Sequence, residues 1–465
     1  MSRGECIRFT APRYNKSVPS HRKNFMKAGV MMIKRLMNKI KTTIWLYPAT
    51  YSLLALALSI SISVIDERYS SSMFVRLNGL FYTTASLAES VLGIIAGAFI
   101  TIATFTFSTS MVVLTMYSSQ FTPRVIENFL NNQTTMKSFG VFLSGFIYSI
   151  TSLLMINTYE GKNHVLSASV GVLYVIIGLV YFLIFINNVA AHIQASGLIL
   201  RLHQEAIMRI NQYRDFIRQS TIISERALIA VIGQKSSIDI FSNSDGYIQE
   251  IDYERLQNIS QDNNIIIFFK KVVGQFISSE TRIITIHTDD PKELNQDAAE
   301  EIKQCIYTGN KRTEVQDFSF TIQKIVEIAL KALSPGINDP NTAIHCLNII
   351  GLLMRDLADL DKGYAILKNK DEHGYLIYER YDFEVSVFDA YNQIVHYGQS
   401  DASVMIAVFK SLRFAKAKAS DENNMIIDEY AARLSEKIKH NAFSNLELRK
   451  IEKEYDELLS YRKIE

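Results

Sequence analysis

The chain has 465 residues, of which 48% are hydrophobic, and a formal net charge of +2 at pH 7. Because this length exceeds one compact domain, two or three domains are expected. Three scattered cysteines, Cys6, Cys305 and Cys346, lack metal-ligand spacing and suit a reducing compartment. The sequence contains no phosphate-binding Gly-rich loop, HExxH motif, CxxC pair or nucleophile elbow. We therefore expect no enzyme, no catalytic residues, no cofactor and no metal site.

The first 41 residues form a basic segment. They hold eleven Lys and Arg residues and one acid, so this segment carries a net charge of +10 and the remainder of the chain −8. A basic tail can bind nucleic acid. This one directly precedes an apolar segment, where Lys and Arg mark the cytoplasmic side of a membrane. A cytoplasmic N-terminal tail is therefore expected, and nucleic acid is not an expected partner.

Four apolar segments follow within residues 42–190, a region predicted to be a transmembrane domain. The first has no charged residue over 22 positions, and about 20 apolar residues span the hydrocarbon core. An even number of spans places both termini on one side, which the basic tail assigns to the cytoplasm. The predicted transmembrane helices cover residues 44–65, 84–117, 139–157 and 165–188.

The second of these segments carries a stripe of small and hydroxyl residues. Its members recur every three or four positions, so they share one helix face: Ser86, Ser90, Gly93, Gly97, Thr101, Thr104 and Ser108. Such a stripe packs helices closely or lines a polar path, and both alternatives remain open. Glu89 flanks the stripe near its outer end, and an acid near a span is a functional candidate.

Just after the stripe, residues 118–124 read SSQFTPR. Arg124 could pair with an anionic lipid headgroup or with the cytoplasmic part of the chain. A structural interpretation is favoured, in which Thr122 caps a helix over 123–131 and Pro123 is its first residue. The candidate residues of this loop are Ser118, Ser119, Gln120, Pro123 and Arg124.

An amphipathic connecting helix is expected over 191–220, followed by a β-rich module over 221–290. Residues 238–252 read as strand, turn and strand, and 265–277 and 281–287 supply two more strands. The module resembles the barrel-sandwich fold of biotinyl and lipoyl carriers and periplasmic adaptors, in which a Gly-Tyr-Ile hairpin occurs. It lacks the modified Lys of the carriers, so no swinging cofactor is implied.

Residues 291–465 are predicted to form a helical domain. A helix over 321–333 ends at a turn that reads SPGINDP. Capping accounts for three of its residues, with Gly336 left-handed, Asp339 as N-cap and Pro340 at the first helical position. A ligand could instead bind Asn338 and Asp339 with Asp317 nearby, but a structural turn is favoured. The candidate residues of this region are Asp317, Ser334, Pro335, Gly336, Asn338, Asp339 and Pro340.

Four segments together resemble the domain-of-unknown-function 2254 family of predicted bacterial membrane proteins. They are SSQFTPRVIENFL (118–130), SDGYIQEID (244–252), RTEVQDFSFTIQKIVEIALKALSPGINDPNTAI (312–344) and FDAYNQIVHYG (388–398). The resemblance runs from about residue 42 to 440. It implies a multi-pass protein of the bacterial cytoplasmic membrane with four spans and a cytoplasmic C-terminal half, and it supplies no function.

The expected fold class is therefore a membrane α-helical domain of four transmembrane helices plus a cytoplasmic α+β part. Two functional hypotheses follow. The first is a homo-oligomeric channel or transport-related protein, whose second helix lines a path through the bilayer and whose cytoplasmic half gates it. The second is a non-conducting scaffold or sensor, whose cytoplasmic half binds a protein or ligand. The ion or ligand stays unknown in both.

Overall fold

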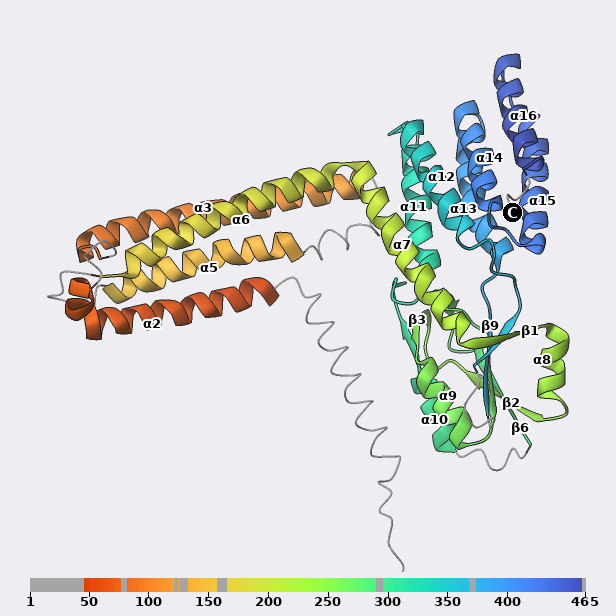
Figure 1. Ribbon diagram of the computed structural model, residues 1–465, viewed down its shortest axis with the longest axis horizontal. Coiled ribbons are helices and arrows are strands. Elements are labelled where there is room, and N and C mark those ends of the chain that lie inside the picture. Colours follow the sequence, from red (N-terminus) through yellow and green to blue (C-terminus); the bar gives the residue numbers. More distant parts are fainter. Residues whose placement is uncertain are drawn as a thin grey trace, which may run out of the picture. The chain divides into compact units, whose positions relative to one another are not determined.

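The computed structural model describes residues 46–76, 82–120, 124, 133–156, 165–289, 296–367 and 374–461. These residues belong to two compact units (Figure 1). The first unit comprises residues 1–110 and 128–188, and the second comprises 111–127 and 189–465. Each unit is described separately below.

The first unit is a bundle of four helices, each long and apolar enough to cross a membrane. This confirms the four predicted spans as apolar helices. At about 1.5 Å per residue, the 36 residues of α3 extend about 54 Å, well beyond a hydrocarbon core of about 30 Å. Residues 111–120 of α3 belong to the second unit. The helices are α2 (Leu46–Arg76), α3 (Ala85–Gln120), α5 (Gln133–Ile156) and α6 (Ser167–Ile193).

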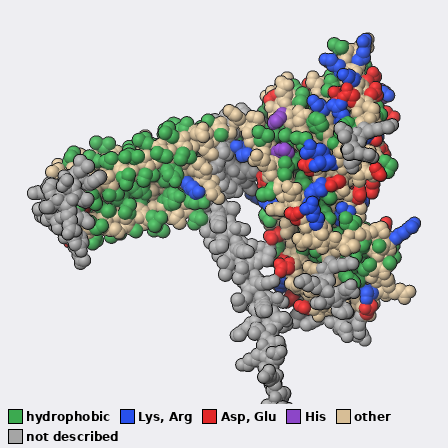
Figure 2. Space-filling view, viewed as in Figure 1, with side chains coloured by type: hydrophobic (Ala, Val, Ile, Leu, Met, Phe, Trp, Pro, Cys, Tyr) green, Lys and Arg blue, Asp and Glu red, His purple; other side chains and the backbone are tan. Residues whose placement is uncertain are grey.

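Glycine notches and hydroxyl pairs hold this bundle together. The ring of Phe99 on α3 lies where an added Cβ would stand at Gly145 on α5, 2.6 Å from the nearest ring atom, and at Gly178 on α6, 2.7 Å away. The buried hydroxyls of Ser59 and Ser152 lie 2.9 Å apart and link α2 to α5. The visible outer face is mostly hydrophobic (Figure 2). Small residues thus let the helices approach closely, and buried hydroxyls such as those of Ser59 and Ser152 pair with each other.

The described residues of the second unit form two β-sheets. The larger is a six-stranded mixed sheet of order β1-β8-β9-β4-β6-β2, antiparallel except for the β4–β9 pair. The smaller has three antiparallel strands in the order β5-β3-β7. The strands are β1 (Ser220–Ile223), β2 (Ser236–Phe241), β3 (Gly246–Ile251), β4 (Ile266–Phe269), β5 (Phe276–Ile277), β6 (Arg282–Thr288), β7 (Ile306–Gly309), β8 (Tyr364–Leu367) and β9 (Tyr375–Glu379).

Strand pairing differs from the expected hairpin. The two strands within 238–252 form as β2 and β3, but they belong to different sheets, so the Gly-Tyr-Ile hairpin is absent. The apolar run 265–277 is divided in the same way into β4 and β5, with Gly274 at φ 92° between them. Alternation and turn residues identify a strand but do not select its partner. Two strands from residues 364–379 also join the larger sheet.

The remaining elements of the second unit are helices. In Figure 1, α11, α12, α13 and α14 lie together beside the sheets, and α7 packs against α11 and α12. The predicted C-terminal helices are therefore confirmed. Their bounds are α7 (Ala195–Arg218), α8 (Glu225–Ile232), α9 (Tyr253–Asp262), α10 (Gln296–Gln304), α11 (Phe318–Ala332), α12 (Pro340–Arg355), α13 (Phe383–Gly398), α14 (Ala402–Lys416), α15 (Asp421–Ile438) and α16 (Asn445–Leu459).

The SPGINDP turn joins α11 to α12. Asp339 caps α12, with its Oδ1 accepting from the Thr342 N–H at 3.1 Å, and Pro340 is the first helical residue, as predicted. The predicted left-handed Gly336 is wrong, because Asn338 takes that conformation, with φ 50°. Asn is the non-glycine residue that adopts it most readily. The backbone conformation of the turn thus accounts for Asn338 without a ligand.

Candidate functional site

Three cations surround the ring of Phe320 in the first turn of α11. The Arg124 and Arg312 guanidinium carbons lie 5.9 and 5.3 Å from the ring centroid, and the Lys324 Nζ lies 5.0 Å from it. Phe320 is buried. Cations favour an aromatic face at this distance. The three cations that contact this ring therefore come from three parts of the chain. Arg124 follows α3 in the sequence, Arg312 lies in the loop before α11, and Lys324 lies on α11.

Each cation pairs with a different carboxylate: Arg124 with Glu327, Arg312 with Asp317, and Lys324 with Glu314. The Arg312 pair is bidentate, with distances of 2.5 Å from Nε to Oδ2 and 3.1 Å from Nη2 to Oδ1. Asp317 also caps α11, accepting from the backbone N–H of Phe320 at 3.0 Å. This double role fixes the Arg312 guanidinium against the start of the helix.

A fourth acid, Glu205 on α7, adds to the charge balance around Lys324. Lys324 is 1% exposed. Burial raises the pKa of Glu205 above its ordinary value, and the neighbouring Glu314 raises it further, while Lys324 opposes the shift. The buried ammonium is therefore balanced by Glu314 at close range and by Glu205 more weakly.

A cavity of about 410 Å³ opens beside this cluster. Among the described residues that line it, four are cations, namely Arg124, Lys311, Arg312 and Lys324, and none is acidic. The other lining residues offer aromatic rings and amides: Tyr247, Asn310, Phe320 and Gln323. We call this space the basic cavity. Its wall has the composition of a site for an anion.

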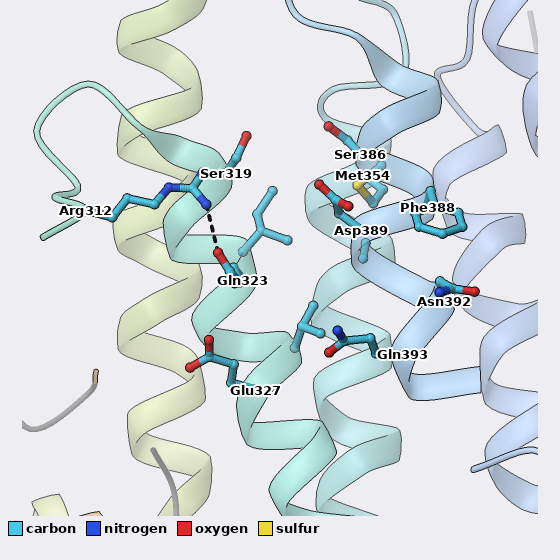
Figure 3. Close-up of a pocket in the computed structure, with 13 residues that line it drawn as sticks. Arg312, Ser319, Gln323, Glu327, Met354, Ser386, Phe388, Asp389, Asn392 and Gln393 are labelled. Atoms are coloured by element: carbon cyan, nitrogen blue, oxygen red, sulfur yellow. Dashed lines mark hydrogen bonds between the residues drawn. The ribbon is translucent and has the colours of Figure 1, made fainter. Parts of the chain in front are cut away.

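A second, smaller cavity of about 280 Å³ lies between α11 and α13 (Figure 3). In the figure, α11 contributes Ser319, Gln323 and Glu327 to this cavity, and α13 contributes Asp389 and Gln393. Arg312 and Gln323 line both cavities, and the Arg312 Nη1 donates to the Gln323 Oε1 at 2.8 Å. The two cavities therefore share this one hydrogen-bonded pair.

The predicted stripe on α3 lies outside the bundle interior. All seven of its residues, Ser86 to Ser108, are exposed, as is the flanking Glu89. An added Cβ at Gly93 or Gly97 would meet no other segment within 4 Å. At about 100° per residue, the stripe is centred opposite the face that carries the buried Ala88, Leu92 and Phe99. The stripe therefore does not pack against any described helix of this chain.

Three of the five hydroxyl residues of the stripe bond back to their own helix. Thr101 Oγ1 donates to the Gly97 carbonyl at 2.7 Å, Thr104 Oγ1 to that of Ile100 at 2.8 Å, and Ser90 Oγ to that of Ser86 at 3.2 Å. Each hydroxyl keeps lone pairs that can still accept a hydrogen bond. At Ser90, Thr101 and Thr104 the stripe thus presents acceptor oxygens rather than donors, and at its two glycines it presents bare backbone.

The signature loops have different outcomes. Ser118 and Ser119 are exposed at the end of α3. Pro123, the side chain of Gln120 and the predicted helix over 123–131 lie outside the described residues, apart from Arg124. The structure brings Arg124 and Asp317 into one cluster, where Arg124 pairs with Glu327 and Asp317 pairs with Arg312.

Sequence reasoning missed Phe320, Arg312, Lys324 and Glu327 as members of this cluster. The available signal is their place in the segment 312–344, which begins with Arg312 and is one of the four segments that carry the family resemblance. Ser334 and Pro335 in the same segment belong to the turn and do not line either cavity.

Four apolar helices and a mixed α+β unit define this chain as a predicted membrane protein. It belongs to the family described as "Predicted membrane protein (DUF2254)", whose model matches residues 41–413. It is similar to uncharacterized protein Mb1321c of Mycobacterium bovis and to uncharacterized protein Rv1290c of Mycobacterium tuberculosis. Each is 21% identical over 403 residues, covering 84% of this chain and 75% of the relative. No solved structure matches this chain.

Proposed function

We propose that this protein forms a homo-oligomer in a bacterial cytoplasmic membrane, with α3 of each copy facing a shared axis along a path for ions or small solutes. The observation that carries the proposal is the exposed stripe on the face of α3 opposite its buried face. Apolar side chains cover most of the lipid-facing surface of a span, whereas glycines and hydroxyls on one helix face suit close approach of another helix or contact with water.

The proposal also assigns the second unit a gating role on the cytoplasmic side. α3 contributes residues to both units. Just beyond its end, Arg124 pairs with Glu327 of α11. A rearrangement of α11 would therefore act on the segment that directly continues the stripe-bearing helix.

A test begins with purified full-length protein in liposomes, using ion flux and the mass of the protein in detergent as measurements. The double variant Thr101→Leu with Thr104→Leu changes the stripe, and Ser61→Leu is the matched control. Ser61 is likewise exposed on a span and donates to the Ala57 carbonyl of its own helix at 2.8 Å. We expect an oligomer whose flux falls in the double variant and stays unchanged in the control. A strictly monomeric protein without flux would refute the proposal.

One observation favours a second candidate, a non-conducting scaffold or sensor. The basic cavity lies entirely within the second unit and could recognise a ligand without any path through the bilayer. The flux measurement separates the two, because only the first candidate requires conduction.

A further inference from the structure

The charges of the basic cavity are arranged so that its wall is more positive than the cluster as a whole. Arg124, Arg312 and Lys324 all have carboxylate partners, yet Glu327, Asp317 and Glu314 do not line the cavity. The three carboxylates therefore lie outside the described lining of this cavity, and Glu327 lines the smaller cavity instead, so the cluster is near neutral overall while the wall carries positive groups. Such an arrangement binds an anion without leaving buried charge uncompensated in the empty protein.

The groups that can reach a ligand differ from those that only contribute charge. The Arg124 side chain is 47% exposed, and Lys311 and Asn310 are also exposed. Lys324 is 1% exposed, and the Arg312 guanidinium is already bonded to Asp317 and Gln323. The flexible donors thus lie at the mouth of the cavity and the fixed positive charge lies at its wall.

The volume and the uncharged lining restrict the class of ligand. About 410 Å³ falls in the range of about 300–1,000 Å³ that is usual for small-molecule sites, and it is far larger than one inorganic anion needs. Tyr247 provides an aromatic surface, and Asn310 and Gln323 provide amides that can both donate and accept. These groups suit a polar organic body attached to the anionic group.

We propose that the basic cavity binds the phosphate group of a small phosphorylated organic molecule or of a phospholipid headgroup. Arg124 and Lys311 would hold the phosphate, because guanidinium and ammonium groups are the usual protein donors to phosphate oxygens. The Tyr247 ring and the two amides contact the organic part. This binding does not depend on the proposed conduction path.

Binding has a consequence at Arg124. A phosphate oxygen competes with Glu327 for the same guanidinium, so an occupied cavity weakens the ion pair between Arg124 and α11. Only this consequence rests on the proposed gating role, and flux measurements would report it separately from binding.

The experiment measures binding to full-length protein in nanodiscs by isothermal titration calorimetry at low salt. Adenosine monophosphate and inorganic pyrophosphate are the soluble probes, in nanodiscs of phosphatidylcholine. A parallel arm compares thermal unfolding in phosphatidylcholine with that in phosphatidylglycerol nanodiscs, which tests a headgroup as the source. The variant is Lys311→Gln, and the control is Lys453→Gln on α16, whose side chain is 75% exposed and distant in sequence from the cavity.

We expect saturable binding of one soluble probe, or stabilisation by phosphatidylglycerol alone, with about a tenfold loss in Lys311→Gln and none in the control. Weaker binding of pyrophosphate than of adenosine monophosphate would support a contribution from the organic part. Equal behaviour of wild type and Lys311→Gln in both arms would overturn the proposal, as would the absence of any response to the soluble probes and to the headgroup. Because binding and not flux is read, a non-conducting protein can still pass this test.

Discussion

The buried ion pair between Lys324 and Glu314 predicts an asymmetry between two single substitutions. Lys324 is 1% exposed, whereas the side chain of Glu314 is 26% exposed. Replacing Glu314 by Gln leaves a buried ammonium with weaker compensation. Replacing Lys324 by Met leaves a carboxylate that can turn toward water, and fills the space of the lysine stem with an apolar chain. We expect the first change to cost much more stability than the second.

The magnitude follows from the contact and its surroundings. Opposite charges about 4 Å apart interact by roughly 4 kcal/mol at an effective dielectric constant of about 20. Removing one partner of a buried pair costs about 3–5 kcal/mol. Glu205 also lies close enough to interact with Lys324, so it replaces part of the lost attraction. The expected destabilisation is therefore about 2–3 kcal/mol for Glu314→Gln and below about 1 kcal/mol for Lys324→Met.

Hydrogen exchange on the full-length protein in detergent measures the loss of stability at α11 itself. The opening free energy of the α11 amides is compared among wild type, both single variants and the double variant. The double variant should recover most of the loss seen in Glu314→Gln, because the unpaired ammonium is gone. Equal losses in the two single variants, or a double variant as unstable as Glu314→Gln, would refute the reasoning.

Three further predictions concern other residues of the second unit. The raised pKa of Glu205, caused by burial and by Glu314, means that the folded protein retains a proton which the unfolded chain loses as pH rises above about 4.5. Stability therefore falls above that pH, and thermal midpoints of Glu205→Gln should exceed those of wild type at pH 7 but not at pH 4. Gly351→Ala places a Cβ 2.7 Å from the Ser411 carbonyl oxygen; overpacking of about 1–3 kcal/mol outweighs a gain of about 1 kcal/mol in helix propensity, so the thermal midpoint should fall. Asp339→Ala removes the cap of α12 and should cost about 1 kcal/mol in denaturant unfolding, whereas Asp339→Asn should cost less.

Long runs without charged residues predicted the membrane helices well, and apolar residues at helical spacing predicted the C-terminal helices. Both signals are local in the sequence. The cap at Asp339 was predictable for the same reason. Strand partners were not. Ile240 on β2 pairs with Ile284, whereas Ile248 on β3 pairs with Thr308, and nothing local to residues 238–252 distinguishes these outcomes from a hairpin.

The candidate site was predictable only in fragments. Arg124 and Asp317 were singled out separately, but their common neighbour Phe320 reads as an ordinary apolar residue of a helix. A site built from segments nearly 200 residues apart in the chain depends on tertiary contacts that no local pattern encodes. The stripe on α3 was identified correctly as one face, yet its exposure depends on where the other helices pack.

The six-stranded sheet also determines the order in which this protein can be completed during synthesis. Its outer strand β1 pairs with β8, so Ser220 cannot pair until Leu367 has been synthesised. In the same way, β4 cannot pair with β9 until the chain has been made as far as Glu379. All four apolar helices precede residue 194 and leave the ribosome long before that. Such distant pairing is slow. The newly made chain therefore has membrane helices available for insertion while β4 still lacks its parallel neighbour, and the backbone N–H and C=O groups on that edge of β4 stay unpaired until β9 has been made.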